Sequence, residues 1–425
     1  MAMPASSSAV DSRRQRRHMA DAVRPAASVR VSALAARLAD LHRTLRKRLS
    51  TRELGRLAAR LAVAIPGVGD RLGLSTSAAT YADAADRVLS MTEYDDTFAV
   101  DAPTAAFLDV YRDELGPLWR GGVLHVAARI GVYAIPDGEI RMATGVLRQH
   151  STGRLLAASR LDDRLKAQRP RLHRERRHIA GAVIPLVGAP TGRGNYYHML
   201  CERFRFVLHA LERVPELREA TLIVRDNVPG YHEAFCDQLR VAYPRLRIEA
   251  LPPRVLVTCD ELVAVQREEP HPIGHFAGAA DFRALRAAFR AAYGISDAPL
   301  KRRIWLSRAS IRKRHVLNEA EVLAALEPLG VELVEPQLLS HREQVAMFGE
   351  AELITGPAGA AYTNLIFASP GAKLVEVCPP DLQEPFFVAT ALQAGMRYRH
   401  VFGERSKLYE SFEVDPAAVV AAVTG

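Results

Sequence analysis

The sequence predicts an α/β protein in two halves, preceded by a basic helical segment. From about residue 180 onward, short apolar runs alternate with segments of helical periodicity, which is typical of parallel βαβ units. The 425 residues, 48% hydrophobic and 25% charged, are enough for two or three domains with cores of their own. The excess of basic residues lies at the N-terminus, before the alternating pattern begins.

This basic segment accounts for the whole formal net charge of +9, because the rest of the chain is close to neutral. Residues 1–60 contain 14 Lys and Arg against four Asp and Glu, whereas the remainder has 43 against 44. A neutral body argues against a broad nucleic-acid surface, so we expect no nucleic-acid partner. Apolar residues spaced by three and four from Val31 to Leu45 predict an amphipathic helix. Either its stripe packs on the body, or residues 29–60 make a peripheral membrane contact.

The cysteine pattern and the hydropathy bear on location. The four cysteines form no CxxC pair, which favours free thiols in a reducing compartment. No run of 18 apolar residues and no leader-like apolar stretch follows the first basic residues. We therefore expect a cytoplasmic protein, peripheral at the inner face of the membrane if the basic helix binds lipid.

The order of elements suggests where the domains divide. Within 1–95, residues 1–28 are expected to be disordered and amphipathic helices to follow, with a Pro/Gly turn and short mixed segments at 66–95. The stretch GVLHVAARIGVYAI alternates like a strand, and the PDGEI after it is typical of a hairpin turn. Strand–helix alternation then runs through NYYHMLCERF and ATLIVRD, and returns from RRIWLSR to AKLVEVCP. We predict domains at 1–95, 96–275 and 276–425, the last two being Rossmann-like and facing a cleft.

The stretch LITGPAGAAYTN, residues 353–364, carries six small or rigid residues between a predicted strand and helix. A helix N-terminus offers unpaired N–H groups to a phosphate, and small residues let the phosphate approach the backbone. This favours a phosphate contact at Gly356, Pro357, Gly359 and Ala360, with Asn364 on the following helix. The alternative is a close-packed turn with no ligand.

Charged side chains follow two other strands of the same half. Arg308 ends the strand RRIWL, and Arg314 lies in the basic loop after it, where Asn318 and Glu321 predict a capping box. Arginines at the carboxyl end of such a strand suit phosphate binding, unless they are only a solvated turn. Glu376, near the end of AKLVEV, is placed to accept hydrogen bonds from a ribose, unless it is a chance edge carboxylate.

In the other half, the loop GRGNYYHMLCE opens a helix. Asn195 and Tyr197 are candidates for the acceptor side of a cleft. His198 is a candidate general base that Glu202, one turn later, would orient. The alternative is a capping Asn beside a packed histidine.

These motifs together resemble glycosyltransferase family 61. The resemblance rests on NYYHML, LSRxxxxxRxxxNE, LSxxEQVAMF and GPxGAxxTNLIFxxPGxxLVEV, in this order, over roughly residues 100–400. It implies a GT-B-like fold and an inverting enzyme that takes a nucleotide sugar, commonly UDP-linked, into surface polysaccharide such as capsule. One departure stands in the turn: the family usually reads GPHGA, and this chain has Ala358 at the third position. His315 or Arg314 would then supply the missing polar group.

The resemblance leads to a specific expectation and leaves three alternatives. The nucleotide diphosphate would bind Arg308 and Arg314, and a glycan or lipid-linked acceptor would be deprotonated by His198 or Glu202. We expect no cofactor and no catalytic metal, since no Asp-x-Asp follows a suitable strand. The alternatives are a weakened nucleotide- or glycan-binding pseudoenzyme, a nicotinamide-dependent enzyme, which the missing GxGxxG disfavours, and a membrane scaffold.

Overall fold

A computed structural model describes residues 78–79, 81–156, 175–187, 196–268, 278–311, 314–379, 385–405 and 411–425. Ser77–Gly425 form one compact unit that contains two large sheets, so the predicted division at residue 275 stays a prediction. The basic N-terminal segment, with its predicted helix and membrane contact, lies outside the described residues. No helix of the described ranges is both long and apolar enough to cross a membrane.

The first sheet has ten strands and is mixed. Its path runs β1-β6-β5-β4-β10-β7-β8-β9, and β2 and β3 also pair with β4. The strands are β1 Ala78–Ala79, β2 Arg87–Ala99, β3 Trp119–Arg120, β4 Val123–Arg141, β5 Val146–Gln149, β6 Leu155–Leu156, β7 Glu175–Leu186, β8 Thr221–Arg225, β9 Arg247–Leu251 and β10 Val255–Arg267. β10, β7, β8 and β9 form a run of four parallel strands, and the short strands β1 and β6 also pair in parallel. Because β4 pairs antiparallel with β10, β2, β3 and β5, a Rossmann-like first half is not confirmed.

The predicted hairpin turn at PDGEI is wrong. β4 continues through these residues and stays paired with β10 on both sides of Asp137, whose φ is +53°. The chain reverses later, at Gly145, whose φ is +72°. The register between β4 and β10 is the same before and after Asp137, so one left-handed residue is accommodated inside the strand without a reversal.

The second sheet has five parallel strands in the order β12-β11-β13-β14-β15. They are β11 Arg302–Leu306, β12 Glu332–Val334, β13 Ala351–Pro357, β14 Lys373–Cys378 and β15 Arg397–Phe402. Successive residues face opposite sides: Leu374 packs toward the core shared with the first sheet, and Val375 packs toward α12 Glu319–Leu326 and α15 Pro416–Thr424. The chain reverses its direction of winding between β11 and β13, so this is the switch point of the sheet. The predicted α/β class is confirmed.

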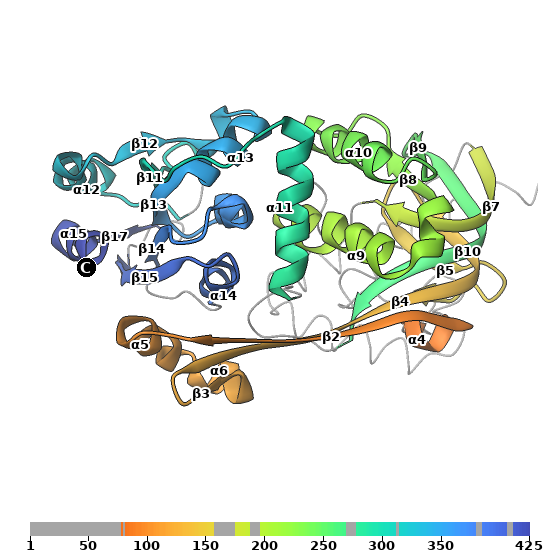
Figure 1. Cartoon of the computed structure of the whole chain (residues 1–425), viewed down its shortest axis with the longest axis horizontal. Helices are drawn as coiled ribbons and strands as arrows, with labels where there is room; N and C mark the ends of the chain where they lie inside the picture. The colour runs from red at the N-terminus through yellow and green to blue at the C-terminus, as the bar shows by residue number, and fades with distance from the viewer. Residues whose placement is uncertain are drawn as a thin grey trace, which may run out of the picture. The chain divides into compact units, whose positions relative to one another are not determined.

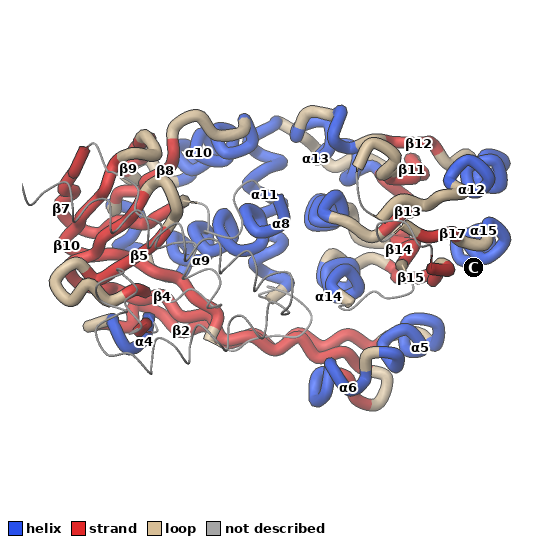
Figure 2. The backbone as a smooth tube through the Cα atoms, turned by 180° about the vertical axis from the view of Figure 1, so that it is seen from behind, coloured by secondary structure: helices blue, strands red, loops and turns tan. Residues whose placement is uncertain are grey.

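Helices fill the space between the two sheets (Figure 1). The helices on the side of the first sheet are α8 Tyr196–His198, α9 Arg205–Arg213, α10 Gly230–Ala242 and α11 Ala279–Tyr293. The helices on the side of the second sheet are α13 His341–Glu350, a 3₁₀ helix at Ala360–Phe367 and α14 Phe386–Gln393. Seen from behind, α8 and α11 again lie between the sheets (Figure 2). Phe289 and Phe367 have ring centroids 5.6 Å apart, and one continuous apolar core includes residues of both halves.

A long ribbon made by β2 and β4 reaches from the first sheet to the second (Figure 1). It carries α5 Ala102–Val110, α6 Arg112–Leu115 and β3. The Thr104 hydroxyl donates to the Tyr398 carbonyl at 3.1 Å, and Arg399 pairs with Asp101 at 2.6 Å. Residues near 100 therefore pack on β15, although the sequence assigns them to the first domain. The small strands β16 Glu404–Arg405 and β17 Phe412–Glu413 and the short helix α4 Tyr81–Ala84 complete the described strands and α-helices.

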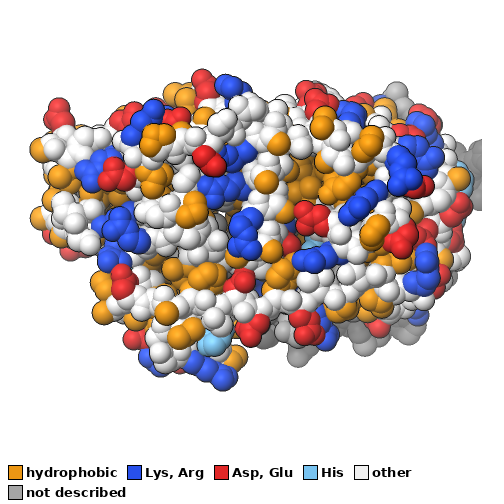
Figure 3. Space-filling model, in the orientation of Figure 1, with side chains coloured by type: hydrophobic (Ala, Val, Ile, Leu, Met, Phe, Trp, Pro, Cys, Tyr) orange, Lys and Arg blue, Asp and Glu red, His pale blue; other side chains and the backbone are white. Residues whose placement is uncertain are grey.

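The predicted capping box at Asn318 and Glu321 is also wrong. The Asn318 side chain makes no cap hydrogen bond; its amide donates to the Val414 carbonyl at 2.9 Å and its oxygen accepts from the Val414 N–H at 3.1 Å. A capping box does form at α13, where Ser340 and Glu343 bond each other's backbone. On the face shown in Figure 3, basic and acidic side chains are interspersed.

Candidate functional site

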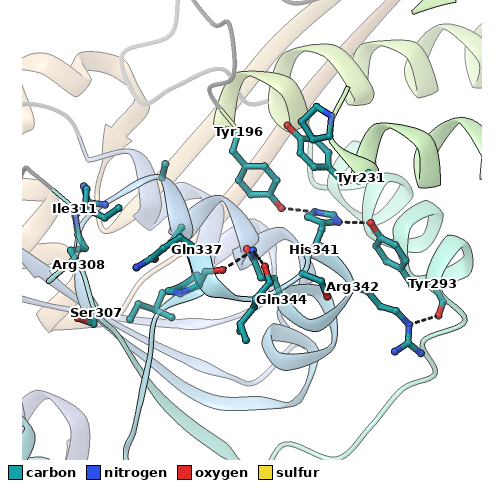
Figure 4. A pocket seen from close by; sticks show the side chains of 18 of the residues that line it. Tyr196, Tyr231, Tyr293, Ser307, Arg308, Ile311, Gln337, His341, Arg342 and Gln344 are labelled. Atoms are coloured by element: carbon teal, nitrogen blue, oxygen red, sulfur yellow. Dashed lines mark hydrogen bonds between the residues drawn. The ribbon is translucent and has the colours of Figure 1, made fainter. Parts of the chain in front are cut away.

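A cavity of about 760 Å³ opens at the carboxyl edge of the five-stranded sheet (Figure 4). One side is formed by α8, α10 and α11, through Tyr196, Tyr231 and Tyr293. The other side is formed by the ends of β11, β12 and β13, including Ser307, Arg308, Pro336, Gln337, Leu339, Pro357 and Ala360. Among the described residues that line it are two arginines, Arg308 and Arg342, and no carboxylate. Such a lining favours a ligand with an apolar part and a negative charge.

The geometry of the turn shows why residue 356, the first of its two glycines, has no side chain. The φ of Gly356 is +133°, which a residue with a side chain rarely adopts. A Cβ atom there would lie 2.7 Å from the Leu306 carbonyl oxygen and 3.0 Å from its nitrogen. The Tyr362 hydroxyl also donates to the Gly356 carbonyl at 2.5 Å. Gly356 is therefore required for packing of β13 against β11.

The second glycine of the turn, Gly359, makes room for a side chain that lies just after the end of β11. Its backbone is extended, with φ −178°, but a Cβ atom there would lie 2.0 Å from Nη1 of Arg308. The guanidinium therefore lies directly over this glycine, across the switch point between β11 and β13. Burial lowers the pKa of Arg308, and the neighbouring Arg314 lowers that pKa further. Two cations brought together in a partly dehydrated place favour binding of an anion.

Arg314 is fixed on the same turn. Its φ of +59° is unusual for a residue with a side chain, and its Nη1 donates to the Ala358 carbonyl at 3.3 Å. Ala358 itself is fully buried. The end of β11 is held by Glu319, which accepts from the Trp305 indole at 2.7 Å and from the Ser307 hydroxyl at 2.9 Å. Sequence reasoning missed Glu319, because the capping prediction was assigned to its neighbours.

The cavity also has a hydrogen-bonded tyrosine wall that the sequence did not indicate. The Tyr196 and Tyr293 hydroxyls lie 2.7 Å from Nε2 and Nδ1 of His341, which is the first residue of α13. Tyr196 also bonds the Asn364 side chain at 2.5 Å. The only local signal is the position of His341 directly after the Ser340 cap in LSHREQ, which marks a helix start and not a contact.

The Glycosyltransferase 61 family profile matches residues 196–375, and this span contains every described residue that lines the cavity. Over this span the chain is similar to glycosyltransferase family 61. The resemblance noted from the motifs is thus confirmed for this part of the chain. Among curated proteins, none matches the chain significantly.

Not all residues predicted for a family-61 site meet at the cavity. Arg308, Pro357 and Ala360 line it, and Gly356, Gly359 and Arg314 form or contact the turn beside it. Asn364 is fully buried beneath the cavity, with its amide bonded to Tyr196 and Gln344. Its contact with a donor stays a prediction.

Glu376 is fully buried near the same turn, with its Cα paired in register with Gly356. Burial raises the pKa of Glu376 to about 7, although the Tyr398 hydroxyl, donating at 2.9 Å, and Arg314 oppose the rise. It does not line the cavity, so its predicted ribose contact stays a prediction.

The predicted base lies outside the cavity. His198 and Glu202 pair at 2.7 Å between Nδ1 and Oε1, and the Tyr197 ring lies 5.5 Å from that of His198. Met199–Phe204 is a π-helical segment, a distortion often found at functional sites. Glu202 lines a separate small cavity beside Tyr81 and Val263. Asn195 lies outside the described residues.

Proposed function

We propose that this protein transfers a sugar from a nucleotide-sugar donor, a UDP-sugar being favoured, to a glycan or lipid-linked acceptor in surface polysaccharide synthesis. The observation that carries the proposal is the guanidinium of Arg308 lying over Gly359 at the switch point of a parallel sheet. A ligand at this edge can place phosphates against the turn and its other end in the cavity. The transferase class follows from the family; the donor, acceptor and pathway are the proposal.

In the proposed reaction the acceptor hydroxyl loses its proton to His198 or Glu202, which pair with each other outside the cavity, so the acceptor would enter from their side of Tyr196. The oxygen attacks the anomeric carbon from the face opposite the nucleotide. The bond from that carbon to the diphosphate oxygen breaks, and configuration inverts. Arg308 and Arg314 stabilise the negative charge on the departing diphosphate, without a metal ion in this proposal. The two sheets would act as the two sides of a GT-B-like enzyme, held peripherally at the inner face of the cytoplasmic membrane by residues 29–60.

Arg308→Ala tests the donor site. We expect one nucleoside diphosphate among UDP, GDP, ADP and dTDP, tested beside CMP and NAD, to raise the melting temperature of the wild type. The variant should bind it about 10- to 100-fold more weakly, because it loses charge-assisted hydrogen bonds. Arg303→Ala, at the opposite end of β11 and bonded to the Leu329 carbonyl, is the matched control.

If the nucleotide raises the melting temperature of Arg308→Ala as much as that of the wild type, the phosphates bind elsewhere. Tight nucleotide binding without sugar transfer would favour a second candidate, a catalytically weakened pseudoenzyme. That candidate is supported by Ala358, which is fully buried where the family usually has a histidine.

His198→Ala tests the base. We expect the turnover number to fall about 100-fold or more at neutral pH with little change in donor affinity, since a general base contributes about this much. His178→Ala, an exposed histidine paired with Asp260 on the first sheet, serves as control. Wild-type turnover in the His198 variant would assign the base to another residue.

A further inference from the structure

A chain of side-chain hydrogen bonds runs from one wall of the cavity to the other, and Figure 4 shows its part from Tyr293 through His341 to Tyr196. It starts at Tyr293 on α11, passes through His341 and Tyr196, and continues to Asn364. The Asn364 amide then meets Gln344 at 2.8 Å. Gln344 ends the chain on the carbonyls of Pro336 and Leu339, at 2.9 and 3.1 Å.

The two carbonyls fix the direction of each bond as far as Nε2 of His341, and a neutral ring then fixes the last one. A carbonyl oxygen only accepts, so the Gln344 NH₂ donates to both, and its oxygen accepts from the Asn364 NH₂. The Asn364 oxygen then accepts from the Tyr196 hydroxyl. That hydroxyl has one proton, so its oxygen accepts from Nε2–H of His341. Nδ1 is left as the acceptor for the Tyr293 hydroxyl.

This direction requires a neutral imidazole. Burial, and then the neighbouring His232, lower the pKa of His341 to about 4, so the ring is neutral at pH 7. The ring also sits in an aromatic cluster, with centroids 4.9 Å from Phe289 and 5.1 Å from Tyr231. His341 thus has one tautomer and one orientation.

The chain joins two walls that come from different halves of the fold. Tyr196 and Tyr293 belong to helices of the first sheet, and Pro336 to Leu339 is the loop after β12 of the second. Because each link has a single direction, loss of one bond leaves a buried donor or acceptor unpaired in its neighbour. We propose that His341 is a positioning residue that holds the tyrosine wall and the loop in the arrangement that binds the nucleotide; this rests on the proposed function for what the cavity binds.

Three variants break the chain at different links. Tyr293→Phe removes its end, Tyr196→Phe removes a hydroxyl bonded on both sides, and His341→Phe keeps a ring but removes both bonds. His232→Phe is the matched control: it is a buried histidine of the same aromatic cluster, 4.7 Å from the Tyr231 ring, outside this chain. The probe is UDP, or whichever nucleoside diphosphate stabilises the wild type.

We expect Tyr293→Phe to weaken nucleotide binding about 3-fold, and Tyr196→Phe and His341→Phe about 10-fold. The KM for the donor should rise with a smaller change in kcat, and His232→Phe should leave the dissociation constant unchanged. The double variant Tyr196→Phe/His341→Phe should lose less affinity than the two single losses combined, because both single variants remove the same bond between Tyr196 and His341. Since the tyrosine variants each lose one oxygen, they test the chain even if His341→Phe fails to fold.

A second measurement separates failure of this inference from failure of the proposed function. Imidazole nitrogen NMR reports the tautomer without any ligand, and we expect a His341 signal with the proton on Nε2, perturbed in Tyr293→Phe. If the wild type binds no nucleoside diphosphate but this signal is present, the donor assignment fails while the chain stands. A proton on Nδ1, or lower melting temperatures with unchanged dissociation constants in the tyrosine variants, would overturn the role of His341.

Discussion

Alanine substitutions at Gly356 and Gly359, the two glycines of the turn, should have different consequences: the first should lower stability and the second should lower nucleotide affinity. We expect Gly356→Ala to lose about 3–5 kcal/mol of unfolding free energy, because it combines backbone strain at φ +133° with a Cβ placed 2.7 Å from the Leu306 carbonyl. Both colliding partners are backbone, so neither can turn away. Urea unfolding at constant pH measures the loss.

Gly359→Ala should leave stability within about 1 kcal/mol of the wild type, because extended backbone suits alanine and the colliding atom is the end of a flexible side chain. The Arg308 guanidinium must move, so nucleoside diphosphate affinity should fall by about 10- to 100-fold, as in Arg308→Ala. The double variant Gly359→Ala/Arg308→Ala should bind no worse than either single variant. Full affinity in Gly359→Ala would show that Arg308 can hold the phosphate from another position. A stable Gly356→Ala would contradict the close approach of β13 to β11.

The contrast answers the question that the small-residue stretch raises in the sequence. The sequence favoured a phosphate contact but could not separate it from a close-packed turn. The two glycines have different roles in the structure. A Cβ atom at Gly356 would collide with the backbone of β11, and a Cβ atom at Gly359 would collide with the side chain of Arg308. A one-dimensional pattern cannot make this distinction, because both neighbours come from a strand about 50 residues earlier.

The features that could be predicted from the sequence are those that a local pattern of apolar and polar residues encodes. The parallel second sheet and the strand-end placement of Arg308 came from alternating apolar runs, which encode strands and helices directly. The tyrosine wall could not be predicted, because Tyr196, Tyr293 and His341 come from three separate helices and no local pattern indicates that they meet. The packing of residues near Thr104 on β15 depends on a contact across 294 positions. The mixed pairing in the first sheet was not predicted, because β4 and β10 are far apart in the chain. The residue pattern of a buried strand also does not show whether it will pair in parallel or antiparallel.

Glu376→Gln should make the protein more resistant to alkaline pH. Burial raises the pKa of Glu376 from 4.5 to about 7, so the folded protein favours the protonated carboxyl. The stabilisation from that protonated state is present below pH 4.5 and is lost as pH rises through about 7. Glutamine imitates the protonated form at every pH and can still accept from the Tyr398 hydroxyl. Relative to the wild type, the variant should therefore gain up to about 3 kcal/mol between pH 5 and pH 8.

Urea unfolding of both proteins at pH 5 and pH 8 measures this gain. Glu352→Gln, on the neighbouring strand β13 and half exposed beside Arg303, is the control and should run parallel to the wild type. Parallel pH dependence in Glu376→Gln would mean that the buried carboxyl ionises without penalty. The expected result also bears on the donor site, because an ionised Glu376 beside the turn would repel a diphosphate. Wild-type affinity for a nucleoside diphosphate should then fall from pH 6 to pH 8 more than that of Glu376→Gln, which keeps the turn neutral except for its arginines.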